Sequence, residues 1–339
     1  MTITIIGLDI AKNVFQIHGV DAEGRVQVAK TLRRGKVKTF FAALAPCLVG
    51  VEACATSYYW ARVLRALGHD VRLIAPAHVK PYVRRNKTDA ADAAAICEAV
   101  SRPMTRFVPL REEGDQAVMA LHRLRAMLVK QRTMLINALR GHLAEFGVVA
   151  PRGREGADEL CALVADQEEQ RVPAQLRPGL MICSGLIETL EAEIGAIEAP
   201  LKRWHAQSAA SRRLATIPGV GLITATAIAA KVDNPARFAS GRSFAAWLGL
   251  TPGQHSSGGK VQLGPITKAG DRYLRRLLVG GAQSLLTAAK RRRTPDPWLV
   301  KLLAGKPRMV AAVAVANKLA RIAWAVMMRQ TNFRAAEPA

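Results

Sequence analysis

Two carboxylates lie three residues apart in the alanine-rich stretch 87–96, at Asp89 and Asp92. In a helix this spacing places both side chains on one face. Two acids on one face repel each other, and a divalent cation between them would remove that repulsion. Acids in a first helical turn also complement the macrodipole, and Asp89 could be a simple N-cap. The pair therefore indicates either a metal site or an ordinary helix start.

Two further acids end predicted strands. Asp9 lies in the apolar run 2–10, and Glu52 ends the run 48–52. A buried lone carboxylate is rare unless it is paired or binds a metal. The simpler readings are that Asp9 caps the turn at residues 11–13 and that Glu52 is a solvated strand end. Because two-metal phosphoryl transfer needs several converging carboxylates, the four acids together predict a divalent-metal site of this kind.

The surrounding pattern predicts how these acids are positioned. β-Branched runs at residues 2–10, 13–20 and 25–32 predict three strands, and residues 21–24 predict a hairpin turn. A helix over 35–44, a strand over 48–52, a helix over 57–67, a strand over 71–74 and the helix carrying Asp89 follow. A meander followed by crossover units gives a mixed sheet with helices on its faces. This is the element order of the α/β RNase H-like (RuvC-like) fold.

The middle of the chain predicts long helices. Residues 113–146 carry an apolar stripe with basic residues opposite, and a second amphipathic helix covers about 180–204. They predict a coiled coil, either antiparallel within the chain or between subunits, or a plain helical hairpin. Residues 147–178 predict a loop with one short helix. We expect three domains, at residues 1–111, 112–205 and 206–339.

The C-terminal part carries the basic charge. The chain of 339 residues has a net charge of +23. Residues 1–200 hold 26 Lys/Arg against 22 Asp/Glu, whereas residues 201–334 hold 23 against 3. Such an excess indicates a polyanion, nucleic acid before membrane. Five scattered cysteines, no signal peptide and an apolar stretch 309–328 broken by Asn317, Lys318 and Arg321 predict a cytoplasmic protein.

Glycines and cations within this part predict nucleic-acid contacts in a mainly α-helical domain. Residues 216–225 have the glycine spacing of a helix-hairpin-helix, whose backbone N–H groups can hold a phosphate, or of an ordinary turn. A polar, glycine-rich loop covers 251–260, a basic helix begins near residue 268, and apolar helices over about 297–304 and 309–328 close the core. The candidate nucleic-acid contacts are Gly219, Gly221, Lys260, Lys268, Arg272, Arg275, Arg276, Arg291, Arg292 and Arg293.

These motifs resemble the DEDD transposases of bacterial insertion sequences, more narrowly the family numbered one-ten, its eleven-eleven subgroup and the related Piv DNA invertases. The N-terminal resemblance rests on residues 7–12, 51–53 and 87–93, and the C-terminal resemblance on 217–221, 249–252, 255–259 and 267–271. It covers nearly the whole chain, and its four acids are Asp9, Glu52, Asp89 and Asp92.

The resemblance implies a function. The four acids would hold Mg²⁺, and a serine in the loop would attack DNA to give a phosphoserine link. Ser257, immediately before Gly258, fits the family register, with Ser256 as second choice. The partners would be double-stranded DNA of the element ends and target, a structured non-coding guide RNA, and further copies in a homodimer or homotetramer.

Other readings stay open at this point. A Holliday-junction-type nuclease needs the acids but not the serine, and a Piv-like invertase needs both. A non-catalytic DNA-binding protein needs only the basic C-terminal part. Without the family match, residues 256–259 would be taken as a flexible connector.

Overall fold

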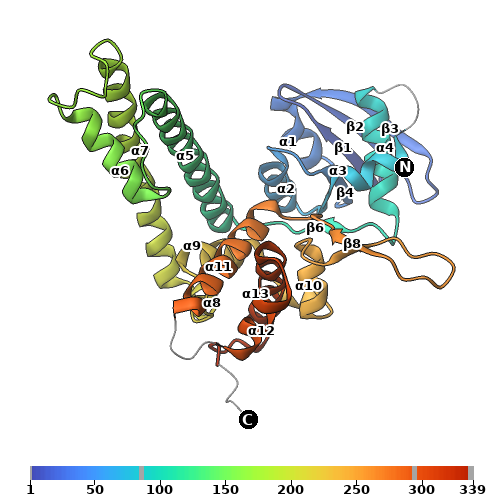
Figure 1. The fold of residues 1–339 in the computed structure, drawn as a ribbon. Coiled ribbons are helices and arrows are strands. Elements are labelled where there is room, and N and C mark those ends of the chain that lie inside the picture. The colour runs from blue at the N-terminus through green and yellow to red at the C-terminus, as the bar shows by residue number, and fades with distance from the viewer. Residues whose placement is uncertain (1, 84–87, 292–295, 335–339) are drawn as a thin grey trace. The chain divides into compact units, whose positions relative to one another are not determined.

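The computed structural model describes residues 2–83, 88–291 and 296–334. The chain forms two compact units, Met1–Glu112 and Glu113–Ala339. The elements of each unit are labelled in Figure 1.

The first unit is built on a mixed sheet of six strands in the order β3-β2-β1-β4-β5-β6. β1 pairs antiparallel with β2 and parallel with β4, so it is the strand where the meander meets the crossover units. The predicted mixed α/β arrangement is therefore confirmed, and β6 is a short edge strand that the sequence did not reveal. The strands are β1 (Ile5–Ile10), β2 (Val14–Val20), β3 (Val26–Arg33), β4 (Leu48–Glu52), β5 (Asp70–Ile74) and β6 (Phe107–Val108).

Helices cover both faces of this sheet. One core joins Ile6, Leu8, Val49 and Val51 to side chains of α1 and α2. The other joins Ile74 to Ile96 and Val100 of α4. The alternation of strand side chains between two helical layers explains why the strands are apolar on both faces. The helices are α1 (Arg34–Ala42), α2 (Ser57–Ala66), α3 (Pro76–Val79), the 3₁₀ turn η1 (Lys80–Tyr82) and α4 (Asp89–Ser101).

Two strand glycines set how closely α4 lies on the sheet. A Cβ on Gly7 would be 2.1 Å from the Ala93 carbonyl oxygen, and a Cβ on Gly50 would be 2.7 Å from Cβ of Val100. Gly7 and Gly50 are register partners on β1 and β4. The backbone of α4 therefore rests directly on these two strands.

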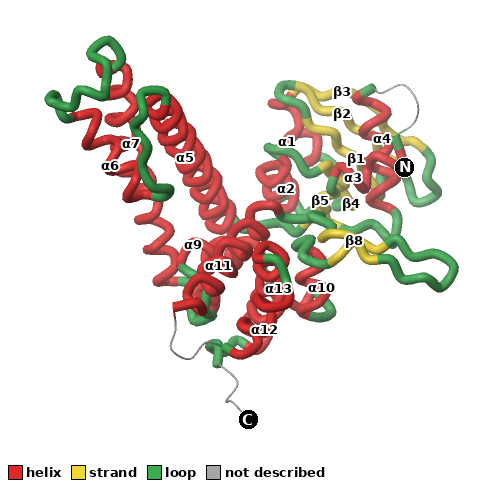
Figure 2. The backbone as a smooth tube through the Cα atoms, viewed as in Figure 1, coloured by secondary structure: helices red, strands yellow, loops and turns green. Residues whose placement is uncertain are grey.

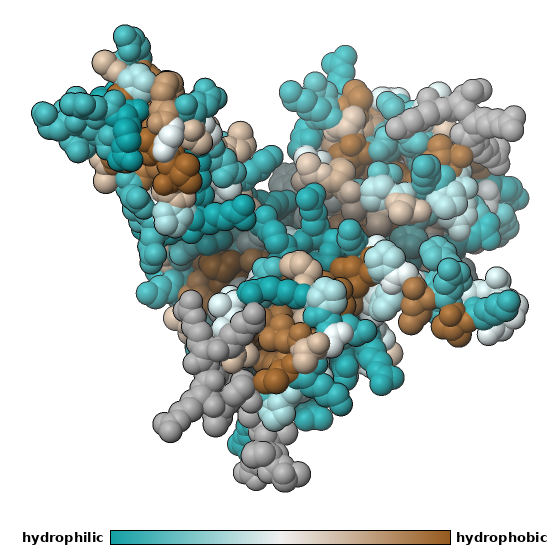
Figure 3. All heavy atoms as spheres, viewed as in Figure 1, coloured by the Kyte–Doolittle hydropathy of each residue, from teal (hydrophilic) through white to brown (hydrophobic). Residues whose placement is uncertain are grey.

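The second unit begins with a helical arm of α5 (Glu113–Ala144), α6 (Arg154–Ala165) and α7 (Arg177–Gln207). Ion pairs Arg125–Glu198 and Arg132–Glu191 run in opposite sequence directions, so α5 and α7 are antiparallel within one chain. Leu139, Leu143 and Leu180 form its core with α6. Hydrophobic residues are also visible on the surface of this arm (Figure 3). The side chain of Ile182 in α7 is exposed.

The remaining helices surround one large aliphatic core, which contains Leu214, Ile228, Leu278 and Val315. α13 is long and apolar enough to span a membrane by composition, but its Ala312, Ala316 and Ala320 are fully buried in this core. Figure 2 shows that loops and one short hairpin connect these helices. The elements are α8 (Ala209–Ala215), α9 (Leu222–Lys231), η2 (Pro235–Arg237), α10 (Gly241–Trp247), β7 (Pro252–Gln254), β8 (Leu263–Ile266), α11 (Arg272–Arg291), α12 (Pro297–Gly305) and α13 (Arg308–Arg329).

Candidate functional site

The start of α4 is capped by Thr88. Its hydroxyl accepts a hydrogen bond from the Ala91 N–H at 3.2 Å, which satisfies one of the free donors of the first turn. The alternative that Asp89 is the N-cap is therefore wrong. Asp89 and Asp92 both lie in the first turn, with their carboxylates available for another role.

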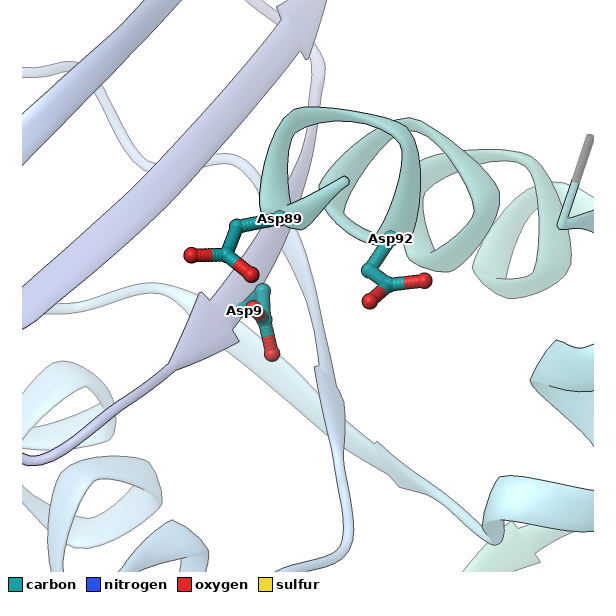
Figure 4. A group of neighbouring side chains, drawn as sticks. All are labelled: Asp9, Asp89 and Asp92. Atoms are coloured by element: carbon teal, nitrogen blue, oxygen red, sulfur yellow. The ribbon is translucent and has the colours of Figure 1, made fainter. Parts of the chain in front are cut away.

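Asp9 reaches these two aspartates from the sheet (Figure 4). One ligand oxygen of each residue lies within 4.8 Å of the other two. Asp9 has the same strand parity as Gly7, so its side chain lies on the α4 face of β1. The close approach at Gly7 thus positions the first turn of α4 over the end of β1. Asp9 and Asp92 are half-buried, and Asp89 is exposed.

Glu52 is not a member of this three-residue group. It is the last residue of β4 and follows Val51, the register partner of Leu8. Glu52 therefore lies beside Asp9 in the sheet. It is two residues after Gly50, so its side chain is on the same face of β4 as the position where a Gly50 Cβ would meet α4. The structure thus brings Asp9, Asp89 and Asp92 together and leaves Glu52 on the neighbouring strand, on the same face of the sheet.

The donor set fits a hard divalent cation. Mg²⁺ binds oxygen ligands at about 2.0–2.1 Å, so ligand oxygens around one ion are about 3–4 Å apart. A spread of 4.8 Å needs only small side-chain rotations to reach that distance. Among the described residues, neither Asp89 nor Asp92 has an ion-pair partner. Asp9, Asp89 and Asp92 would hold the ion.

The predicted serine loop is an ordered hairpin in the second unit. β7 and β8 pair antiparallel, and the ladder continues through His255–Gln262 to a bridge between Ser257 and Lys260. Gly258 and Gly259 have φ of +56° and +77°, as a two-residue hairpin turn requires. Residues 256–259, whose composition alone would assign them to a flexible connector, therefore form the turn of a regular hairpin.

The two serines differ in their contacts. The Ser256 hydroxyl accepts hydrogen bonds from Nε2 of Gln254 at 2.9 Å and from the Gln262 N–H at 3.2 Å. The Ser257 hydroxyl has no hydrogen-bond partner among the described residues, and Ser257 is exposed. Ser256 holds the hairpin together, whereas Ser257 presents a free hydroxyl beside the turn.

The base of this hairpin is held by the neighbouring motifs. Gly249 and Gly270 both have positive φ, and a Cβ on Gly270 would be 1.8 Å from the Trp247 carbonyl oxygen. Arg275 donates to the carbonyl oxygens of Leu248 and Ala269 at 2.8 and 3.0 Å. The Arg275 guanidinium, predicted to contact nucleic acid, is thus used as a clamp on the hairpin base.

The predicted helix-hairpin-helix is formed by α8, the turn at residues 216–221 and α9. Gly219 has φ of +82° and lies against α11, where a Cβ on Gly281 would be 2.0 Å from the Gly219 carbonyl oxygen. Gly221 is exposed, N-caps α9 and has open space beside its Cα. Gly219 therefore has a packing role, and Gly221 is the glycine that leaves a helix N-terminus accessible.

The other predicted cations are placed in different ways. Lys260 and Lys268 are exposed on and after the hairpin, and Lys268 has φ of +53°. Arg272 is exposed at the start of α11, and the Arg276 guanidinium lies 5.3 Å from the Tyr273 ring centroid. Arg291 ends α11, and its side chain lies outside the described part of the chain together with Arg292 and Arg293.

A buried polar network, which no sequence pattern predicts, lies between α5, α9 and α11. Nδ1 of the fully buried His122 lies 3.0 Å from the Tyr273 hydroxyl, and Nε2 lies 3.1 Å from Thr226 Oγ1. Thr226 also donates to the Leu222 carbonyl, so it accepts from Nε2–H, and Tyr273 donates to Nδ1. Burial lowers the pKa of His122 to about 4, assisted by the charge of Arg125.

Comparison with known proteins finds matches to transposase families over both units of the chain. A model described as "Transposase IS116/IS110/IS902 family" matches residues 211–296, and a transposase model of the IS110 DEDD type matches residues 6–147. The chain is 47% identical over 336 residues to a probable family 20 transposase of Pseudomonas aeruginosa, covering 98% of this chain and 99% of the relative.

Two further relatives are transposases of insertion sequences. The transposase for element IS1328 of Yersinia enterocolitica is 40% identical, covering 98% of each chain. The transposase for element IS1111A of Coxiella burnetii is 39% identical, covering 98% of this chain and 92% of the relative. With both units matched and full-length similarity at these identities, the chain belongs to the IS110/IS116/IS902 family of insertion-sequence transposases.

Proposed function

We propose that this transposase cuts and rejoins DNA strands, with the acids of the first unit and Ser257 of the second as its two reactive centres. The observation that carries the proposal is the convergence of Asp9, Asp89 and Asp92 oxygens within 4.8 Å at the carboxyl end of β1. The strand order supports an RNase H-like fold for the first unit.

The acids would act as a carboxylate cradle for Mg²⁺ and DNA phosphate. A bound divalent cation would neutralise phosphate charge during displacement at phosphorus. Asp9 and Glu52 come from adjacent strands, whereas Asp89 and Asp92 come from a helix, so the cradle is fixed by tertiary packing rather than by a loop. Its rigidity would keep the carboxylates in place when phosphate arrives.

Ser257 would supply the covalent step. Its Oγ forms a bond to phosphorus, one P–O bond of the DNA backbone breaks, and the hydroxyl proton passes to a base while the leaving DNA oxygen takes up a proton. Because the phosphoserine link keeps the ester, a second DNA hydroxyl can reverse the step and rejoin strands without another energy source. Lys260 would offset charge near the phosphorus.

The partners follow from the family resemblance and the charge. Double-stranded DNA is the substrate, a structured guide RNA selects element ends and target, and the chain works as a homodimer or homotetramer. The net +20 of residues 201–334 supports a nucleic-acid surface there. We place the protein in the bacterial cytoplasm, associated with the nucleoid.

The proposal is tested by strand exchange on supercoiled plasmid carrying the element ends, with the guide RNA and Mg²⁺. Wild-type protein should produce joined recombinant strands. Asp9→Asn should lower the rate of strand exchange about a thousandfold or more, while DNA binding persists. Asp70→Asn is the matched control, since Asp70 is an exposed aspartate of β5 paired with Arg72.

The same assay separates the other readings. A Holliday-junction-type nuclease would leave cut, unjoined strands, and Ser257→Ala would not change its rate. A Piv-like invertase would exchange only sites within one molecule. Full strand exchange by Asp9→Asn would remove this acid from the mechanism. DNA binding without any cleavage by wild type would leave a non-catalytic DNA-binding role.

A further inference from the structure

A pocket lies between α10 and α13 in the second unit, away from the serine hairpin in sequence. It has a volume of about 590 Å³ and includes Gly241, Arg242, Lys318, Arg321, Ile322 and Trp324 in its lining. A Cβ on Gly241 would lie 3.2 Å from Cα of Arg321, so the two helices meet directly at one side of the pocket. None of the motifs that carry the family resemblance includes these residues.

The rim of the pocket is cationic and uncompensated. Arg242, Lys318 and Arg321 are exposed, and neither arginine has an ion-pair partner among the described residues. The three acids of residues 201–334 are engaged elsewhere. Asp233 pairs with Arg237, Asp271 pairs with Lys231, and Asp296 caps α12. The pocket therefore attracts an anion.

Apart from Ser240, whose side chain caps α10, the rest of the pocket lining is apolar. Ile322 and Trp324 are half-buried and pack against the core of the second unit. The Trp324 indole donates from Nε1 to the Pro235 carbonyl at 3.1 Å, which holds the ring in place. The Lys318 ammonium lies 3.9 Å from the Trp298 ring centroid, so this cation is also held. An apolar wall beside a cationic rim suits a flat apolar group joined to an anion.

We propose that this pocket holds one unpaired nucleotide of a nucleic-acid strand, with the base against Ile322 and Trp324 and the flanking phosphates on Arg242 and Arg321. The proposal rests on the proposed function only in taking nucleic acid as the partner. Proteins usually hold single strands by stacking bases on apolar or aromatic side chains and by placing cations beside the phosphates. A duplex keeps its bases paired and cannot fill the apolar part.

The test measures binding of single-stranded DNA and RNA oligonucleotides containing 2-aminopurine to the full chain. Arg242→Gln with Arg321→Gln should weaken binding of single strands about tenfold and lower the salt slope by about 1.4, because two phosphate contacts are lost. Duplex binding should change much less. Wild type should quench 2-aminopurine fluorescence as the base stacks, and the double variant should not.

The control pair is Lys202→Gln with Arg203→Gln, two exposed cations at the end of α7 that do not line the pocket. A second variant, Ala325→Trp, fills the pocket without changing its charge and should also reduce quenching. Thermal unfolding of each variant shows whether it is folded. Weaker binding of the DNA oligonucleotide alone, of the RNA oligonucleotide alone or of both identifies which strand the pocket holds.

Three results would overturn the assignment. They are equal weakening by the control pair, equal weakening of duplex and single strands, or unchanged quenching in folded Ala325→Trp. Competition by micromolar adenosine monophosphate would also overturn it, because the ligand would then be a free nucleotide. Since no catalytic step is measured, failure of strand exchange and failure of the pocket remain distinguishable.

Discussion

At the scale of single residues, Ser256 and Ser257 are neighbours in sequence with different positions in the hairpin. The Ser256 hydroxyl accepts hydrogen bonds from Gln254 and Gln262. The Ser257 hydroxyl has no hydrogen-bond partner among the described residues. Sequence alone offered two serines and a register taken from family resemblance. The hairpin geometry adds a physical reason to prefer Ser257, because a nucleophile must be free to meet phosphorus.

Ser257→Ala should therefore lose the covalent protein–DNA adduct on a nicked suicide substrate while keeping DNA affinity. Ser256→Ala should keep the adduct, with strand exchange lowered by about thirtyfold at most, because removing two exposed hydrogen bonds costs about 2 kcal/mol. Denaturing gels and peptide mapping give both results. An adduct that survives in Ser257→Ala but disappears in Ser256→Ala would reverse the two roles.

The acids allow a second prediction at this scale. Asp89→Asn and Asp92→Asn should each weaken Mn²⁺ binding, measured by calorimetry, because each removes charge from the three-oxygen group. Glu52→Gln should weaken it too, from its place beside Asp9 in the sheet. Asp70→Asn should bind Mn²⁺ like wild type. Unchanged binding in Glu52→Gln would restrict the site to the three aspartates.

At the scale of elements, the site depends on how α4 rests on β1. Gly7→Ala would place a Cβ 2.1 Å from the Ala93 carbonyl oxygen, so α4 must shift and carry Asp89 and Asp92 with it. We expect a loss of about 2 kcal/mol in unfolding free energy and a large loss of strand exchange. Gly141→Ala in α5, where nothing lies within 4 Å, should instead stabilise the protein slightly. Chemical denaturation and exchange assays measure both; wild-type activity in Gly7→Ala would contradict this dependence.

The buried network of His122 gives a pH prediction for α5, α9 and α11. The unfolded chain binds a proton near pH 6.5, whereas folded His122 binds one only near pH 4. Lowering the pH from 6.5 to 4 therefore favours the unfolded state, by about 3 kcal/mol when complete. Above pH 6.5 this contribution does not change. Denaturation of wild type and His122→Gln across this range checks it, and identical slopes would assign the pH dependence to other groups.

At the scale of the whole molecule, charge and chemistry are divided along the chain. The proposed carboxylate site belongs to the unit Met1–Glu112, which has a net charge of +8, whereas residues 201–334 carry a net +20. DNA affinity of the full chain should fall about a thousandfold between 50 and 200 mM salt if six phosphates are contacted. A fragment of residues 1–112 should bind far more weakly at low salt. Equal affinities at every salt concentration would contradict this division.

The division also permits a mixing experiment. If the carboxylates and Ser257 that act on one strand come from different subunits, Asp9→Asn mixed with Ser257→Ala should regain part of the strand exchange that each lacks alone. Mixed oligomers would contain some sites with both intact centres. No recovery, with mixed oligomers demonstrated by tagged co-purification, would place both centres of each site in one subunit.

The sequence by itself determined the elements and the residues that could do chemistry. These are local patterns: the strand and helix periods, the hairpin turn at residues 21–24 and the position of Asp9 at a strand end. Local patterns can be recognised in the sequence without knowledge of the fold. The mixed sheet followed from the order of these elements. The family followed from motifs spread over the chain, and the full-length relatives confirm it.

Tertiary structure decided which of these residues meet. The Gly7 contact with Ala93 brings Asp89 and Asp92 to Asp9, and strand register places Glu52 beside Asp9. Tertiary contacts also bring Nη1 of Arg275 to the carbonyl oxygens of Leu248 and Ala269, and the pairing of β7 with β8 gives residues 256–259 the form of a hairpin turn. These outcomes depend on contacts between residues distant in the chain or on pairing across a turn. Composition and spacing do not encode such contacts in any single segment, because their energy arises only when two segments come together.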